Sequence, residues 1–372
     1  IYAELTYRYF MFDDGLDGYG GGGTRVGNHD DQMLIGAAGY TGVELMRLIA
    51  GHPEMDLVAA TGDSQAGTAV ASLYPNLAAH YPDLVFGDSN PATLAQLIDG
   101  VDVAFLGLPH EASLSLAPTL VGKVGCVVDL SAAYRLKDAS AYPKWYGFTH
   151  DQPDLLKQAV YGLPELHRDA LVGAQLVATP GCYVTAATMA LAPLVRLGLI
   201  QNSGIIVDAA SGVSGAGRVP KQNNNFTTVN EDMNAYGLLD HRHTPEMQEQ
   251  IGAELLFTPH LVPMNRGILA TCYARPVIGS SLSTQSLLDA MKTFYANEPF
   301  VVVRSESPST KATLGSNAVH ITARYDERTG YVVVISALDN LCKGASGGAL
   351  QAANVALGLP ETSGLTSIGV YP

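Results

Sequence analysis

The chain has 372 residues, of which 47% are hydrophobic and 15% charged, so it can bury a large core and its length suggests two domains. Its net charge of −14 argues against nucleic acid or an anionic membrane surface as the main partner. We find no stretch with the roughly 20 apolar residues of a spanning helix and no secretory signal, and therefore expect a cytoplasmic protein without a membrane partner.

The first 32 residues are atypical of the rest. They are aromatic at the start and then rich in glycine and acidic residues. They lack the Arg-rich, acid-poor character of an organelle transit peptide. We expect residues 1–32 to be a poorly ordered lead with no part in function.

Residues 33–181 alternate between buried strands and helices. Strands are predicted at 33–35, 55–61, 101–110 and 125–131, and helices after the glycines near 40, at 91–100 and at 112–123. Short apolar strands that alternate with helices are typical of a parallel, doubly wound sheet. The first domain is therefore predicted to be a Rossmann-type dinucleotide-binding domain. Its first strand is the weakest element, because "NHDDQ" precedes only three apolar residues.

Residues 182–341 have a different pattern of predicted helices and strands. A helix is predicted at 183–199 and another at 283–298. Between and after them, several runs alternate apolar and polar residues, which is typical of a sheet with one covered face. These strands are predicted at 204–212, 268–278, 300–306, 317–327 and 330–340. We expect a second, α+β domain with a mixed or antiparallel sheet, used for catalysis and oligomerisation, and a C-terminal helix in 342–372 that joins the first domain.

The turn "IGAAGYTG" places Gly36, Gly39 and Gly42 between a strand and a helix. In that position the first glycine permits a tight turn, the second admits a pyrophosphate, and the third permits close packing. The free N–H groups of the helix start attract phosphate. A plain strand–helix turn is the alternative. Asp63 would favour NAD through the ribose hydroxyls, whereas Ser64 and Gln65 could bond the 2′-phosphate of NADP, and the local sequence leaves both open.

The four cysteines are far apart and form no CxxC pair, so we expect no metal site and no disulfide framework. Cys126 and Cys272 lie in strand-like apolar runs and are expected to be buried and inert. Cys182 differs, because it follows Pro-Gly at the start of a helix. A helix N-terminus lowers the pKa of a cysteine and favours the nucleophilic thiolate. Catalysis and inert packing are both compatible with this pattern.

A base for such a cysteine is available in "HRHTPEM". His241 or His243 could transfer protons near neutral pH, and Arg242 between them could bind a carboxylate or phosphate. The segment "SGVSGAGRVPK" adds Arg218 and Lys221 in a loop of small residues that could bind an anion. For both segments a solvated surface loop is the alternative.

Taken together, these motifs resemble one known family. The chain is similar, over residues 33–372, to the N-acetyl-γ-glutamyl-phosphate reductases, the arginine-pathway branch of the semialdehyde dehydrogenase superfamily. The resemblance rests on "GAAGYTGVEL", "FLGLPH", "DLSAAYR", "YGLPEL", "TPGCY", "SGVSGAGR", "HRHTPEM", "PHLVPMNRGI" and "LDNLCKGA" in this order. "AAYR", "CYVT" and "LCKG" replace the family's common "ADFR", "CYPT" and "LVKG", and none of these differences removes a functional group.

The resemblance implies reduction of N-acetyl-γ-glutamyl phosphate, a small-molecule acyl phosphate, to N-acetyl-glutamate 5-semialdehyde and phosphate, with NADPH as cofactor. It implies that Cys182 is the nucleophile that forms a thioester and that His241 or His243 is the acid–base group. Substrate ligands would be Arg135, Ser211, Gly212 and Arg242. The cofactor ligands implied are Gly36, Ala38, Gly39, Tyr40, Thr41, Gly42, Ser64, Gly107, Pro109 and Asn340.

Two other functions stay open on the sequence alone. Aspartate-semialdehyde dehydrogenase shares the thioester chemistry but lacks the "HRHTPEM" arrangement. A nucleotide-sensing protein could keep the fold and lose catalysis, although the retained Cys182 argues against this. We also expect a homo-oligomer, a dimer or a tetramer, with the open face of the second sheet as the subunit contact.

Overall fold

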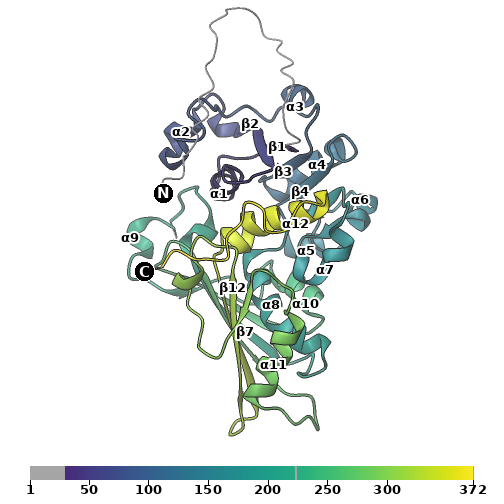
Figure 1. The fold of residues 1–372 in the computed structure, drawn as a ribbon, viewed down its shortest axis with the longest axis vertical. Helices are drawn as coiled ribbons and strands as arrows, with labels where there is room; N and C mark the ends of the chain where they lie inside the picture. The colour runs from purple at the N-terminus through teal and green to yellow at the C-terminus, as the bar shows by residue number, and fades with distance from the viewer. Residues whose placement is uncertain (1–29, 223, 372) are drawn as a thin grey trace, which may run out of the picture.

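The computed structural model describes residues 30–222 and 224–371, arranged around two sheets (Figure 1). Residues 1–29 of the expected poorly ordered lead lie outside the described residues. The last three residues of that lead, 30–32, instead form the start of the first strand, β1 (Asp30–Ile35). Among the described residues no helix is long and apolar enough to cross a membrane.

The first sheet has six strands in the order β2-β1-β3-β4-β6-β5, and every pair is parallel. Its strands are β1, β2 (Met55–Ala60), β3 (Val103–Leu106), β4 (Cys126–Asp129), β5 (Val160–Tyr161) and β6 (Leu176–Ala178). β1 extends beyond its apolar residues because it pairs with β2 on one side and β3 on the other, and Gln32 is fully buried. Backbone pairing, rather than hydrophobicity, therefore sets the length of this strand.

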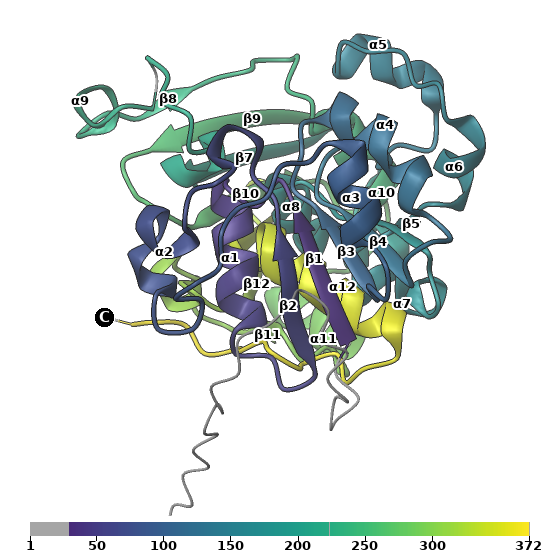
Figure 2. The ribbon, with the colours of Figure 1, turned by 90° about the horizontal axis from the view of Figure 1, so that it is seen from above.

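Helices cover both faces of this sheet, as the alternation of apolar residues requires. Alternate residues such as Leu34 and Phe105 pack against one set of helices, and Met33 and Ala104 pack against the other. The first set is α1 (Tyr40–Ile49), α7 (Pro164–Leu171) and α12 (Gly347–Leu357); the second is α3 (Pro91–Leu97), α4 (His110–Leu120), α5 (Tyr142–Trp145) and α6 (Pro153–Gln158). Figure 2 shows α1 and α4 on opposite sides of β1. The predicted doubly wound fold is confirmed.

The second sheet is mixed, with seven strands in the order β11-β12-β13-β10-β7-β9-β8. Its strands are β7 (Ile205–Gly212), β8 (Asn234–Ala235), β9 (Leu255–Val262), β10 (Ile268–Ala274), β11 (Val301–Val303), β12 (Val319–Asp326) and β13 (Tyr331–Leu338). One face packs on α8 (Cys182–Arg196), α10 (Thr244–Ile251) and α11 (Thr284–Phe294). The two remaining short helices are α2 (Val70–Leu73) and α9 (Phe226–Val229).

The C-terminal segment connects the two sheets. After β13 the chain makes a π-helical turn at Cys342–Ser346 and continues into α12, whose alanines pack on the first sheet. The helix is shorter than the expected 342–372 segment, because Gly358, with a φ of 74°, ends it. The chain then returns to the second domain, where the Val370 N–H donates to the Leu314 carbonyl at 2.7 Å.

Candidate active site

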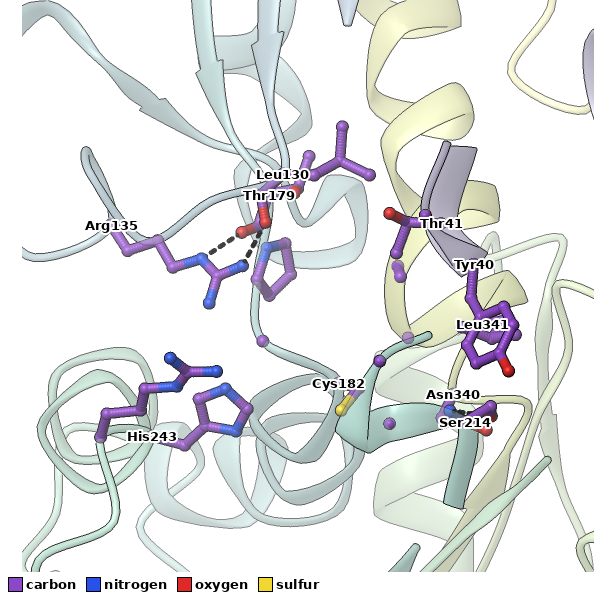
Figure 3. A pocket seen from close by; sticks show the side chains of 18 of the residues that line it. Tyr40, Thr41, Leu130, Arg135, Thr179, Cys182, Ser214, His243, Asn340 and Leu341 are labelled. Carbon is purple, nitrogen blue, oxygen red and sulfur yellow. Dashed lines mark hydrogen bonds between the residues drawn. The ribbon is translucent and has the colours of Figure 1, made fainter. Parts of the chain in front are cut away.

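A cavity of about 290 Å³ opens where the carboxyl edge of the first sheet meets the start of α8 (Figure 3). Both domains contribute to its wall, which brings the glycine turn, the "TPGCY" segment and the "HRHTPEM" segment together. The lining includes Gly39, Tyr40, Thr41, His110, Arg135, Cys182, Ser214, Arg218, Arg242, His243 and Asn340. A second cavity of about 450 Å³ shares Cys182, Arg242 and His243 with the first.

Cys182 is the first residue of α8, one residue before the start of the helix predicted at 183–199, and its side chain is partly buried between the two cavities. The lowered pKa expected at a helix start is not found. Burial raises the pKa of the Cys182 thiol to about 11, although the N–H groups of Tyr183 and of Cys182 itself, and the charges of Arg135 and Arg242, act in the opposite direction. Loss of hydration therefore outweighs the helix N-terminus, and the resting side chain is a thiol.

The two histidines of "HRHTPEM" differ in position. His243 is buried and lines both cavities with Cys182, and Figure 3 shows its ring facing the thiol. Burial, followed by the charges of His241 and Arg135, holds its pKa well below the ordinary value, so the ring is neutral at pH 7. Its Nδ1 atom has no hydrogen-bond partner in the described part of the chain. The ring edge lies so close to Gly181 that a Cβ there would overlap Nε2.

His241 lines the second cavity only and is packed edge-on against the rings of Tyr183, Tyr236 and Phe257. Its Nδ1 accepts the His243 backbone N–H at 3.1 Å, so the neutral ring carries its proton on Nε2. Burial lowers the pKa of His241 to about 4. This arrangement makes His241 a support for the backbone of His243.

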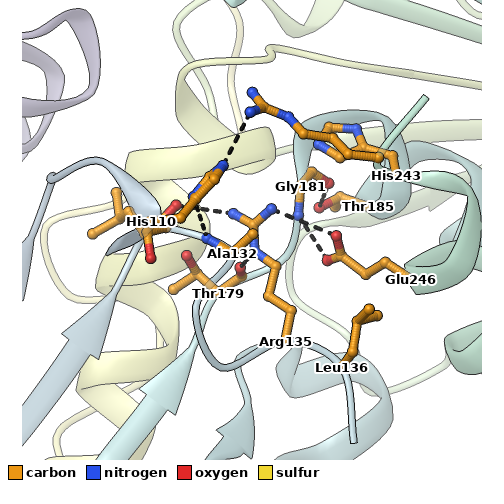
Figure 4. Close-up of polar contacts among 12 residues, drawn as sticks. His110, Ala132, Arg135, Leu136, Thr179, Gly181, Thr185, His243 and Glu246 are labelled. Atoms are coloured by element: carbon orange, nitrogen blue, oxygen red, sulfur yellow. Dashed lines mark hydrogen bonds and ion pairs between the residues drawn. The ribbon is translucent and has the colours of Figure 1, made fainter. Parts of the chain in front are cut away.

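A buried carboxylate that the sequence interpretation missed anchors the cysteine turn (Figure 4). Glu246, on α10, accepts the Gly181 N–H at 3.0 Å and the Tyr161 hydroxyl at 2.7 Å through Oε1. Its Oε2 lies 3.5 Å from Nη1 of Arg135. Glu246 is therefore the common partner of the residue before Cys182 and of the first domain.

The two candidate substrate arginines have different surroundings. Arg135 is buried, and its guanidinium donates to the carbonyls of Thr179 at 2.6 Å and Leu130 at 2.9 Å, as well as contacting Glu246. Much of its hydrogen-bonding capacity thus holds the strand ends beside Cys182. Arg242 is exposed, and in residues 30–222 and 224–371 no carboxylate pairs with it.

The glycine turn has the geometry of a phosphate cradle. Gly36 has a φ of 80°, and a Cβ there would lie 2.7 Å from the Gly107 carbonyl oxygen. A Cβ on Gly42 would overlap the Ala37 carbonyl. A Cβ on Gly39, which precedes α1, would meet nothing within 4 Å, so this backbone is open to a ligand. These three environments fit a dinucleotide above the turn.

The other candidate cofactor residues lie around this turn. Ala38 is buried in the turn. Gly62, which follows β2, packs against it, since a Cβ on Gly62 would lie 2.9 Å from the Ala38 Cβ. Ser64 is exposed and follows Gly62 by two residues. Pro109 is exposed and immediately precedes α4. Asn340 lines the cavity, but its Oδ1 accepts the Gly267 N–H at 2.7 Å and its Nδ2 donates to Ser214 at 2.9 Å.

Of the two candidate substrate residues of β7, Ser211 lines a cavity and Gly212 does not. Ser211 lines the second cavity together with Lys221 and Trp145. Gly212 is not in the lining of either cavity, because it packs against the backbone of residues 264–265, where a Cβ would lie 2.8 Å from the Asn265 carbonyl.

We find no group of three or more metal-binding side chains among the described residues. Burial raises the pKa of Cys126 to about 12, and the thiols of Cys272 and Cys342 are buried as well.

Comparison with known proteins agrees with this geometry. Residues 33–174 match the family model described as the NAD binding domain of semialdehyde dehydrogenase, and residues 182–340 match the one described as its dimerisation domain. The N-acetyl-gamma-glutamyl-phosphate reductase of Symbiobacterium thermophilum is 48% identical over 91% of this chain and 98% of its own length. That of Geotalea daltonii is 46% identical over 91% and 99%.

The chain belongs to the N-acetyl-γ-glutamyl-phosphate reductase family. As a member of the wider semialdehyde dehydrogenase family, it is an oxidoreductase with a nicotinamide-binding domain. Solved structures share its fold at low identity. Aspartate semialdehyde dehydrogenase II from Vibrio cholerae, complexed with ASA, has a TM-score of 0.66 at 16% identity, covering 88% of this chain and 98% of that one. The enzyme from Candida albicans with NADP has a TM-score of 0.65 at 14% identity, covering 88% and 99%.

Two residues escaped the sequence interpretation although their motifs were noticed: Glu246 behind the cysteine turn and His110 in the lining of the first cavity. Glu246 follows His243 by three residues and so shares its side of α10. His110 ends the "FLGLPH" segment at the carboxyl edge of β3, where ligands bind in open α/β sheets. In each case a polar side chain beside a predicted catalytic segment was the available signal.

Proposed function

We propose that the protein reduces N-acetyl-γ-glutamyl phosphate to N-acetyl-glutamate 5-semialdehyde with NADPH, through a thioester on Cys182. The observation that carries the proposal is that Cys182, His243 and the open backbone of Gly39 line one cavity between the domains. Close relatives with this name match over the length of both domains.

The first half-reaction begins from a thiol beside a neutral imidazole. As the Cys182 sulfur attacks the acyl carbonyl, His243 accepts the thiol proton, an S–C bond forms and the bond from carbon to the phosphate oxygen breaks. The N–H groups of Cys182 and Tyr183 lie beside the sulfur. Because both residues are in the first turn of α8, these N–H groups have no partner within the helix. They are therefore suited to stabilise the carbonyl oxyanion, while Arg242 faces the leaving phosphate.

The second half-reaction returns the sulfur to its resting state. The nicotinamide cofactor, when bound, supplies the hydride that reduces the thioester carbonyl. The protonated His243 then gives its proton to sulfur as the C–S bond breaks and the aldehyde leaves. His243 is preferred to His241 as the acid–base group because it lines both cavities with Cys182 and has a free Nδ1, whereas the Nδ1 of His241 is used by the backbone.

We expect NADP rather than NAD as the cofactor because of the residues that follow β2. Ser64 is exposed there beside the glycine turn, where its hydroxyl can bond a 2′-phosphate. The fold relative from Candida albicans was solved with NADP. The ratio of kcat/KM for NADPH over NADH tests the choice, and a ratio below one would contradict it.

Covalent chemistry is tested by mass spectrometry of the protein mixed with the acyl phosphate without NADPH. We expect an N-acetyl-glutamyl adduct on Cys182. Cys182→Ser should lose turnover and keep NADPH binding; unchanged turnover would disprove the nucleophile. Substrate class is tested in reverse, with phosphate, NADP⁺ and either N-acetyl-glutamate semialdehyde or aspartate semialdehyde. Equal or faster oxidation of the aspartate compound would reject the assignment.

We further propose a homodimer formed through the open face of the second sheet. Alternate residues of β7, β10 and β13 on that face are apolar yet partly exposed, namely Ile206, Leu269, Tyr273, Val333 and Ile335. The matching family model is described as a dimerisation domain. Light scattering should give a dimer mass for the wild-type protein and a monomer mass for Ile335→Asp, and a wild-type monomer would refute the proposal.

A further inference from the structure

Two side chains from different domains meet in the wall of the cavity that Cys182 also lines. His110, labelled in Figure 4, is the first residue of α4, and Arg242 immediately precedes His243 in the sequence. The Nε2 atom of His110 lies 3.0 Å from Nη1 of Arg242. They are 132 residues apart in the sequence.

The hydrogen bond on the other side of the His110 ring fixes its tautomer. The backbone N–H of Ala132 donates to Nδ1 at 3.0 Å. A backbone N–H is always a donor, so Nδ1 holds a lone pair, and the single proton of the neutral ring is on Nε2. The ring is neutral at pH 7, because burial and the charges of Arg242 and Arg135 lower the pKa of His110 to about 4.

The contact between His110 and Arg242 is therefore not a hydrogen bond. A guanidinium has donors only, and the Nε2–H of His110 is also a donor, so two N–H groups point at one another. Facing donors are satisfied when an acceptor with several lone pairs lies within reach of both. No carboxylate of the described chain does so, since none pairs with Arg242.

We propose that His110 Nε2–H and Arg242 together bind the phosphate group of the acyl phosphate substrate, and the inorganic phosphate that it becomes. This inference rests on the proposed function and adds His110 as a catalytic residue. The phosphate is bonded to the carbonyl that Cys182 attacks, so it must lie in the cavity that both side chains line. The distal carboxylate of the substrate can instead extend into the second cavity, past Cys182.

The role of His110 is to donate a hydrogen bond without transferring its proton. A neutral donor stabilises the departing phosphate dianion while the Ala132 N–H holds the ring in place. The acid–base chemistry stays with His243, on the other side of the thiol.

The reverse reaction tests the inference, because phosphate is then a separate substrate. For His110→Ala we expect the KM for phosphate to rise by about tenfold or more, as for the loss of a hydrogen bond to a charged group, with the KM values for semialdehyde and NADP⁺ unchanged. His110→Gln, which can place an amide N–H near Nε2, should recover most of the phosphate affinity. Arg242→Leu, a change at an exposed side chain, should raise the same KM. His80→Ala, an exposed histidine of the same domain, is the matched control.

A binding assay separates this inference from the proposed function. Inorganic phosphate should slow alkylation of Cys182 by iodoacetamide in the wild type and in His80→Ala, but much less in His110→Ala. A wild-type phosphate KM and wild-type protection in His110→Ala would overturn the inference. If the wild-type protein oxidises neither semialdehyde, the proposed function fails, and the alkylation assay still decides whether His110 binds phosphate.

Discussion

Replacing Glu246 by Gln should destabilise the protein, because it removes one partner of a buried ion pair. Glu246 is fully buried and Arg135 is 8% exposed, so water cannot compensate the arginine. The Gln Oε1 can still accept the Gly181 N–H and the Tyr161 hydroxyl, whereas its Nε2–H₂ would face the Nη1 donor of Arg135. The substitution therefore isolates the loss of charge from the loss of the other two bonds.

The size of the destabilisation follows from the geometry of the ion pair between Glu246 and Arg135. Breaking a buried pair costs about 3–5 kcal/mol, and the 3.5 Å separation with the two remaining carbonyl partners of Arg135 favours the lower end. For a chain of this length the entropy of unfolding is roughly 0.8 kcal/mol per degree, so about 3 kcal/mol lowers Tm by about 4 °C. Because Glu246 also holds the residue before Cys182, kcat should fall on the order of tenfold.

Scanning calorimetry and steady-state kinetics on the same preparations provide the assay. Glu249→Gln is the matched control, since Glu249 lies one turn along α10, is partly exposed and accepts the Lys137 backbone N–H at 3.1 Å and the Gln250 side-chain amide at 3.4 Å, with no buried arginine as partner. Its Tm should stay within about 1 °C of the wild type. If Glu246→Gln had the Tm and kcat of the control, the buried pair would not hold the cysteine turn, and the reasoning would be wrong.

Three further predictions concern the thiol, its base and the cofactor turn. Gly181→Ala places a methyl against the His243 ring and should lower kcat by about 100-fold or more while NADPH binding, measured by fluorescence, persists; kcat near wild type would show that His243 is not the acid–base group. Because the pKa of the Cys182 thiol is raised to about 11, the thiolate is scarce at neutral pH, and alkylation of the free protein should accelerate about tenfold per unit from pH 7 to 10; a plateau below pH 9 would contradict the raised pKa. Gly39→Ala should weaken NADPH binding without changing Tm, whereas Gly42→Ala, whose methyl overlaps the Ala37 backbone, should lower both; equal behaviour of the two variants would reject the cradle.

The amino-acid sequence by itself determined the elements and the main parts of the site. Apolar runs and their alternation predicted the parallel sheet, the mixed sheet and, to within one residue, the start of α8. These features depend on neighbours a few residues away, so a local pattern contains them. The same holds for the glycine turn, because its conformation requires glycine at positions that the sequence itself shows.

The tertiary structure decided the charges and the hydrogen bonds of the site. The sequence interpretation predicted a lowered pKa for Cys182 from the helix start, and burial between two domains reverses it. It grouped Arg135 with the substrate ligands, and the fold adds two carbonyls and Glu246 as partners of this cavity-lining arginine. The contact of His110 with Arg242 joins residues 132 positions apart. Desolvation and pairing depend on which distant side chains meet, and only the packing of the two domains brings them together.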